Sequence, residues 1–102
     1  MLKDFENYLK NVRKYSLNTI NSYISDINIF LEYLHIQKLN YKDINHEVIR
    51  SYLKYLDEKK YKNSSINRIL SSLNDYYNYL TKCKVTKYNY FEDINRPRKE
   101  KR

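Results

Sequence analysis

No glycine occurs among the 102 residues of this chain, and proline occurs once, at Pro97. The tight turns of β-hairpins need residues with positive φ, which glycine adopts most readily, so asparagine alone would have to supply them here. Helices joined by short loops suit such a chain far better. A chain of this length removes roughly two-thirds of its unfolded surface from water, which is enough for one domain with a modest core. We therefore expect a single all-α domain.

Apolar residues recur at helical spacing in four segments, as expected for four amphipathic helices. The apolar stripes are Leu2, Phe5, Leu9 and Val12; Ile20, Ile24, Ile27, Leu31 and Leu34, with Tyr23 and Phe30 beside them; Val48, Ile49, Tyr52, Leu53 and Leu56; and Ile66, Ile69, Leu70, Leu73, Tyr77 and Leu80. The first helix is predicted to end near Lys14 and Tyr15. A short fifth helix or turn is predicted at residues 91–94. Four helices of this length form a bundle.

Three short polar residues are predicted to cap these helices. Ser16, Asn45 and Ser64 precede the second, third and fourth stripes, and their side-chain oxygens can accept hydrogen bonds from the free amides of a first turn. Ile44 and Ile49 have the spacing of a hydrophobic staple around Asn45.

Residues that carry catalysis or bind metals are scarce. The single cysteine, Cys83, can form no internal disulfide and has no partner at metal-ligand spacing. His35 and His46 lie in different segments, with no serine or cysteine nucleophile in an obvious relay. A glycine-rich phosphate loop is excluded because glycine is absent. We expect no catalytic residue, no metal and no cofactor, and this chain is not predicted to be an enzyme.

The sequence also predicts no membrane partner. No apolar run approaches the roughly 20 residues of a membrane span, and the first residues lack the apolar stretch of a signal peptide. Together with the lone cysteine, this favours a cytoplasmic location.

Positive charge is concentrated in particular places. The formal net charge is +8, and residues 96–102 hold five bases and one acid, which predicts a basic linker after a domain over residues 1–95. No acid lies between Glu6 and Asp26, or between Glu58 and Asp75, although both windows contain bases. Net positive charge favours a polyanionic partner. An AT-rich genome would also enrich lysine, asparagine, isoleucine and tyrosine, so the charge alone leaves both explanations open.

Each acid-free window covers a basic loop and the first turns of the helix that follows it. A helix N-terminus offers unpaired amides and partial positive charge, and small polar side chains allow a DNA backbone to approach closely. The candidate DNA-binding residues are Lys14, Ser16, Asn18, Thr19, Ser22 and Tyr23 in the first window, Lys62, Ser64, Ser65, Asn67, Arg68 and Ser71 in the second, and Arg96 and Arg98 in the linker. The alternative is that the serines and threonines are only helix caps.

The helical spacing puts polar residues of both windows opposite the apolar stripes. These residues are Asn18, Ser22 and Ser25 on the second helix, and Asn67, Ser71 and Asn74 on the fourth. Both polar faces are predicted to point outward, where an asparagine or arginine can contact base edges in a major groove.

The chain contains 13 tyrosines, most of them on or beside the apolar stripes. Packing in the core and at its boundary is therefore favoured over a nucleophilic or base-stacking role.

In order and with compatible gaps, the sequence resembles the N-terminal core-binding domain of tyrosine recombinases, the family of phage integrases and Xer-type recombinases. The residues that carry the resemblance are Ser16, Leu17, Asn18, Thr19, Tyr23, Asp26, Ile27 and Phe30; Ile44, Ile49, Arg50 and Leu53; Ser65, Ile66, Arg68, Leu70, Ser71, Leu73, Tyr76, Tyr77 and Leu80; and Asn89, Ile94, Pro97 and Arg98.

The resemblance implies a SAM-like four-helix bundle that grips one face of duplex DNA. A separate catalytic domain of the same parent protein would grip the other face and would hold the nucleophilic tyrosine and the arginine, lysine and histidine set. Further recombinase protomers on the DNA are implied as partners. The tail from Arg96 would begin the linker between the two domains and contact phosphates.

The sequence departs from the family pattern at several positions. The family often has glycine where this chain has Lys14, arginine at the positions of Ile24, Ser25, Asn74 and Asn78, and proline at that of Tyr90. Fewer arginines imply fewer phosphate contacts, so a weak affinity is expected for the isolated domain. The predicted function is site-specific duplex DNA binding as the targeting half of a tyrosine recombinase. The alternative is a helical protein-interaction or regulatory bundle without a DNA role.

Overall fold

The computed structural model describes residues 2–94 of the chain. It contains four α-helices, α1 (Leu2–Asn11), α2 (Leu17–Ile36), α3 (His46–Glu58) and α4 (Asn63–Lys82), and two short 3-10 helices, η1 (Tyr41–Asp43) and η2 (Tyr90–Asp93). No strand occurs within these residues, so the predicted all-α bundle with a short helix near its C-terminal end is confirmed. None of the helices in this span is long and apolar enough to cross a membrane.

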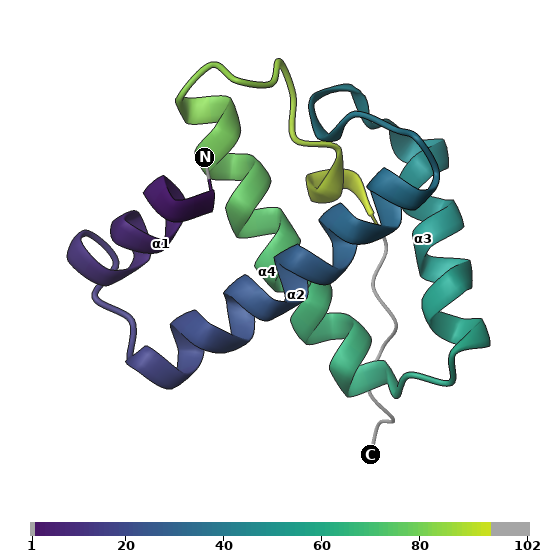
Figure 1. Cartoon of the computed structure of the whole chain (residues 1–102), viewed down its shortest axis with the longest axis horizontal. Coiled ribbons are helices and arrows are strands. Elements are labelled where there is room, and N and C mark those ends of the chain that lie inside the picture. Colours follow the sequence, from purple (N-terminus) through teal and green to yellow (C-terminus); the bar gives the residue numbers. More distant parts are fainter. Residues whose placement is uncertain (1, 95–102) are drawn as a thin grey trace.

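Helices α2 and α4 cross at the centre of the molecule, with α1 on one side and α3 on the other (Figure 1). Both α2 and α4 begin at the lower edge of this view and end toward the upper edge. We call the lower edge, formed by the loops at residues 12–16 and 59–62 and the first turns of α2 and α4, the start edge. The loops that follow α2 and α4, at residues 37–45 and 83–89, form the opposite edge.

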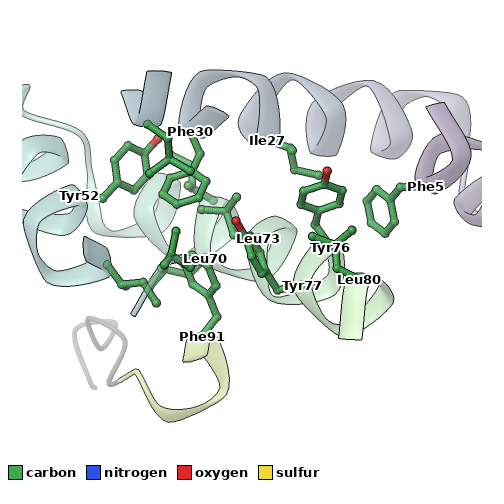
Figure 2. Packing of buried hydrophobic residues seen from close by; sticks show 14 of the residues in the cluster. Phe5, Ile27, Phe30, Tyr52, Leu70, Leu73, Tyr76, Tyr77, Leu80 and Phe91 are labelled. Atoms are coloured by element: carbon green, nitrogen blue, oxygen red, sulfur yellow. The ribbon is translucent and has the colours of Figure 1, made fainter. Parts of the chain in front are cut away.

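Phe30 of α2 lies at the centre of the core and is fully buried. Its ring centroid lies 4.8 Å from that of Tyr52 on α3, 6.3 Å from that of Tyr77 on α4 and 5.8 Å from that of Phe91 in η2. Figure 2 shows these rings converging between the helices. One ring therefore joins four elements of the fold. Helix α1 is attached in the same way, because the Phe5 ring meets that of Tyr76 at 5.2 Å.

The expected packing role of the tyrosines is confirmed for the three that lie fully in the core, Tyr52, Tyr76 and Tyr77. Burial raises the pKa of Tyr76 to about 12 and raises the pKa of Tyr52 and of Tyr77 further. These hydroxyls are therefore protonated at neutral pH and shielded from solvent.

The hydroxyls of Tyr52 and Tyr77 differ in their hydrogen bonding, which allows a matched test. The Tyr77 hydroxyl donates to the carbonyl of Tyr41 at 2.7 Å, whereas the buried Tyr52 hydroxyl has no hydrogen-bond partner within residues 2–94. We expect Tyr77→Phe to lower the free energy of unfolding by about 1 kcal/mol and Tyr52→Phe to leave it unchanged or raise it. Urea denaturation of both variants measures this difference, and an equal loss in the two would contradict the assignment.

Two of the three predicted helix caps are confirmed, and the third is wrong. The Ser16 side chain accepts from the amide of Thr19 at 3.2 Å, and the Asn45 side chain accepts from the amide of Val48 at 3.1 Å. Ser64 is not a cap, because α4 begins one residue before it and Lys62 occupies the N-cap position, with no capping side-chain hydrogen bond. The end of α3 determines where α4 starts. The amide of Tyr61 still bonds to the carbonyl of Leu56 in α3, so Lys62 is the one residue between this bond and the first residue of α4, Asn63.

Within residues 2–94, lysines rather than asparagines occupy the positions with positive φ. These residues are Lys14, Lys38, Lys60 and Lys84, with φ between 54° and 65°. Each lies just beyond the end of an α-helix, where such a conformation commonly ends the helix and glycine is usual. The next residue donates its amide to the carbonyl of a buried leucine: Tyr15 to Leu9, Leu39 to Leu34, Tyr61 to Leu56 and Val85 to Leu80. These hydrogen bonds hold the lysines in a conformation that costs a non-glycine residue about 1 kcal/mol.

The first helix ends earlier than its apolar pattern indicates. Helix α1 stops at Asn11, and Val12, placed on the apolar stripe by spacing, is 64% exposed. The amides of Val12 and Arg13 both bond to the carbonyl of Tyr8, and Lys14 then turns the chain toward Ser16. Because the backbone leaves the helical path at this point, Val12 no longer faces the core.

Candidate nucleic-acid interface

The structure places the helix beginnings of both acid-free windows along the start edge, that of α2 toward one end and that of α4 toward the other (Figure 1). None of the candidate residues of either window is buried. Those classed as exposed are Lys14, Ser16, Asn18, Ser22, Lys62, Ser64 and Arg68, and those half-buried are Thr19, Tyr23, Ser65, Asn67 and Ser71. Arg96 and Arg98 lie outside the described residues.

At the start of α2, some polar side chains cap the helix and others are exposed to solvent. Ser16 accepts from the amide of Thr19, and its own hydroxyl donates to the Thr19 hydroxyl at 3.0 Å, so both side chains are engaged in the cap. Asn18 and Ser22 are exposed beyond this cap. The outward face predicted for α2 is confirmed, since Ser25 is exposed as well.

An aromatic and basic cluster lies beside this helix start. The guanidinium of Arg13 hydrogen-bonds the Tyr15 hydroxyl and lies 4.9 Å from the centroid of the Tyr15 ring. The Tyr15 ring meets the Tyr23 ring edge-on, at 5.7 Å between centroids. Burial raises the pKa of Tyr23, and the nearby carboxylate of Asp75 raises it further, in part because the Tyr23 hydroxyl hydrogen-bonds that carboxylate. Burial alone would lower the pKa of Arg13, but Tyr15, Tyr8 and Asp75 raise it.

At the start of α4, no side chain caps the helix. Lys62 and Ser64 are exposed there, and Arg68 follows little more than one turn later with 52% of its side chain exposed. This helix therefore presents backbone amides and small polar groups at the surface without a competing acidic cap.

Arg68 forms a bidentate ion pair with a buried carboxylate of α2. Its Nε donates to Asp26 Oδ2 at 3.0 Å, and its Nη2 donates to Asp26 Oδ1 at 2.9 Å. The Ser72 hydroxyl donates to Asp26 Oδ2 at 2.9 Å, and Asp26 is only 3% exposed. Hydrogen bonding to Asp26 raises the pKa of Arg68. The contact fixes both the crossing of α2 over α4 and the position of the guanidinium on the start edge.

The acids that end the two windows thus both have partners within the bundle, although Asp26 is buried and Asp75 only half-buried. Asp26, which ends the first window, is paired with Arg68 from the second window. Asp75, which ends the second window, interacts with Arg13 and Tyr23 from the first. Each window therefore supplies a basic partner for the acid that ends the other window.

The prediction of an outward-facing Asn74 is wrong. The buried side chain of Asn89 donates to Asn74 Oδ1 at 2.8 Å and to Asn78 Oδ1 at 3.0 Å, while its own oxygen accepts from the amide of Phe91. The segment after α4 folds back over this helix and covers Asn74. Two of the four positions at which the family often has arginine, Asn74 and Asn78, therefore anchor the η2 segment in this chain.

Asp26 and Arg13 also belong to this site, although the sequence pattern did not predict them there. Asp26 lies between Tyr23 and Phe30 beside the apolar stripe, and a charge in such a position requires a buried partner, which is the signal that could have drawn attention to it. Arg13 gave no such signal, because its contacts depend on where α1 ends.

Within residues 2–94, no group of three or more histidine, cysteine, aspartate or glutamate side chains could hold a metal ion. The exposed groups of the site are bases, amides and hydroxyls, and its carboxylates Asp26 and Asp75 are engaged by neighbouring side chains.

The family model described as the phage integrase N-terminal SAM-like domain matches residues 2–84. The chain belongs to this family. Its SAM-like fold is the one seen in the crossed helices of the bundle, and the match runs through both helix starts. No solved structure gives a significant match to the SAM-like domain described here.

Relatives of this SAM-like domain carry consistent names. A tyrosine recombinase of Pseudothermotoga lettingae is 33% identical over the whole chain, which covers 36% of that protein. Tyrosine recombinase XerC of Leptospira interrogans is 37% identical over 97% of the chain, covering 32% of the relative, and tyrosine recombinase XerD of Shewanella oneidensis is 35% identical over 79% of the chain, covering 27%. The chain spans about a third of the length of the curated relatives it matches.

Proposed function

We propose that this domain binds duplex DNA with its start edge. The observation that carries the proposal is the exposure of two acid-free helix beginnings on one edge of the bundle (Figure 1). The N-terminus of each helix carries about half a positive charge and free amide donors, which suit the phosphates of a DNA backbone. Lys14 and Lys62 add full charges beside these two helix ends.

The dimensions of the molecule agree with this use. The bundle measures 35 × 34 × 23 Å along its principal axes, and one turn of B-form DNA is about 34 Å long. A duplex lying across the start edge would meet both helix beginnings within about one turn. Exposed Asn18 and Ser22 would then face base edges or phosphates of the groove.

We further infer that the domain is the targeting half of a tyrosine recombinase, since its relatives bear that name and are about three times as long. In this proposal residues 1–95 form the DNA-gripping domain, and residues 96–102, with Arg96 and Arg98, begin the linker to a catalytic domain of the same parent protein. Cleavage and joining of DNA would belong to that other domain. Further protomers on the DNA would be its remaining partners.

A salt titration with a mixed-sequence duplex tests the proposal. Each phosphate contacted contributes about −0.9 to the slope of log K against log salt concentration, so contacts from four exposed lysines of the start edge, Lys14, Lys59, Lys60 and Lys62, would give a slope of about −3 to −4. A flat response, or no binding at low salt, would reject DNA binding and favour the helical protein-interaction bundle.

The four lysines with positive φ provide a sharper, charge-matched comparison. The variant K14G/K60G removes two lysines from the start edge, and K38G/K84G removes two from the opposite edge. Each double change lowers the net charge by the same amount. We expect the free energy of unfolding of both variants to exceed that of the parent by about 1 kcal/mol, because glycine adopts positive φ without a steric cost.

Their affinities for duplex DNA are expected to differ. Losing two phosphate contacts should make the salt slope of K14G/K60G shallower by about 1.8, whereas that of K38G/K84G should stay within error of the parent value. Fluorescence anisotropy with a labelled duplex measures both slopes. If K38G/K84G changed as much as K14G/K60G, binding would reflect overall charge rather than the start edge.

A further inference from the structure

A single buried carboxylate joins the two helices that form the start edge. Asp26 is 3% exposed and accepts three hydrogen bonds, two from Arg68 and one from Ser72. Its partner Arg68 is different, since about half of that side chain is exposed. The ion pair therefore has one buried end and one end at the surface.

The way Arg68 is held leaves a defined set of donors facing outward. A guanidinium has five N–H bonds in one plane, and Asp26 takes one from Nε and one from Nη2. Asp26 uses neither hydrogen of Nη1 and only one of the two on Nη2, so the end of the group formed by Nη1 and Nη2 keeps a parallel pair of donors that Asp26 does not occupy. Such a pair matches two neighbouring acceptors, as on the O6 and N7 edge of guanine.

The charge of Arg68 is largely offset by the carboxylate about 3 Å away. An offset charge attracts distant phosphates weakly, whereas the direction of its remaining donors is fixed by the bidentate contact. Arg68 is thus poorly suited to general phosphate attraction and well suited to recognising a pair of acceptors in one orientation.

We propose that Asp26 is a positioning residue that turns Arg68 into an oriented contact to a base edge and so gives the domain part of its sequence preference. Asp26 itself touches no DNA in this arrangement and acts only through Arg68. The proposal rests on duplex binding by the start edge, and its test separates the two ideas.

The experiment compares the full chain with Asp26→Asn. A preferred duplex is first selected with the parent from a randomised duplex library. The affinity ratio between that duplex and a mixed-sequence duplex is then measured for both proteins at several salt concentrations. Asparagine keeps the size of Asp26 but removes the charge and one of the two acceptor oxygens, so the bidentate contact that orients Arg68 is lost. We expect the ratio to fall about fivefold or more, in line with the loss of one bidentate base contact.

The slope of log K against log salt concentration should not change if Asp26 only holds the two helices together. In Asp26→Asn the freed charge of Arg68 can join a phosphate, so the slope for the mixed-sequence duplex should steepen by about 0.9. If the folded variant kept both the parent's ratio and its slope, Asp26 would only hold the helices together and the proposal would be overturned.

Arg68→Lys keeps the test usable if Asp26→Asn does not fold. Lysine retains the charge, but its ammonium group cannot form a bidentate contact to Asp26 and also offer a parallel pair of donors to a base. The affinity ratio between the preferred and the mixed-sequence duplex should therefore fall about as far as in Asp26→Asn. An unchanged ratio in Arg68→Lys would overturn the proposal, as would a parent ratio near one. If the parent bound no duplex at all, the proposed function would be rejected as well. If the parent bound its preferred duplex and both variants kept the same affinity ratio, only the positioning role of Asp26 would be rejected.

Discussion

Replacing Phe30 by alanine is expected to lower the free energy of unfolding by about 3 to 5 kcal/mol. The ring is fully buried and contacts rings from α3, α4 and η2, so its loss leaves a cavity where four elements meet (Figure 2). Domains of this size have about 5 to 15 kcal/mol of stability in total, so the variant should lose a large share of its stability.

Urea denaturation followed by circular dichroism measures this loss. Ile36→Ala is the control, because Ile36 is 69% exposed at the end of α2 and its truncation should cost well under about 1 kcal/mol. A loss below about 1 kcal/mol for Phe30→Ala would show that the aromatic cluster does not hold the bundle together.

Arg68→Ala is expected to weaken duplex binding by about 1 to 3 kcal/mol, a factor of roughly 5 to 150. The side chain is exposed on the start edge and keeps outward donors beyond its contact with Asp26. Its removal also leaves the Asp26 carboxylate without a cationic partner, which adds repulsion toward DNA. Because the same change leaves a buried carboxylate short of hydrogen bonds, stability should fall by about 1 to 3 kcal/mol.

The binding measurement must therefore be made under conditions in which circular dichroism shows the variant to be folded. Lys87→Ala is the matched control, since Lys87 is an exposed cation on the opposite edge. Its affinity should remain within about twofold of the parent. Equal losses for Arg68→Ala and Lys87→Ala would discredit the placement of the interface.

Local patterns in the sequence were enough for most of the fold. The stripes through Ile20, Ile27 and Leu34 specified α2, and the caps Ser16 and Asn45 formed where short acceptors precede a stripe. These features depend on residues a few positions apart, so the sequence displays them directly.

Helix ends were harder to predict than helix interiors. Helix α1 ends before Val12, where the amides of Val12 and Arg13 both bond to the carbonyl of Tyr8 in the same helix, and α4 begins at Asn63, after the amide of Tyr61 bonds back to Leu56 of α3. The lysines with positive φ could have been found from a repeated arrangement, in which a leucine is followed four residues later by a lysine and then by an apolar residue. Leu34, Lys38 and Leu39 form one such set, and the ends of α3 and α4 repeat it.

The candidate site was predictable in its location but not in its internal pairing. The absence of acids marked both windows, and small polar residues marked the helix starts. The contact between Asp26 and Arg68 spans 42 residues, and that between Asn89 and Asn74 depends on a segment that folds back over α4. No short-range pattern encodes such contacts, because they arise only once the helices cross.

The most direct test of the account is to map the contact surface by titrating the isotope-labelled chain with a mixed-sequence duplex and following its backbone amide resonances by NMR. The account predicts that the largest shifts fall in the loops before α2 and α4 and in the first turns of both helices, with the loops at residues 37–45 and 83–89 unaffected. Shifts confined to those two loops, or present at only one of the two helix starts, would contradict it.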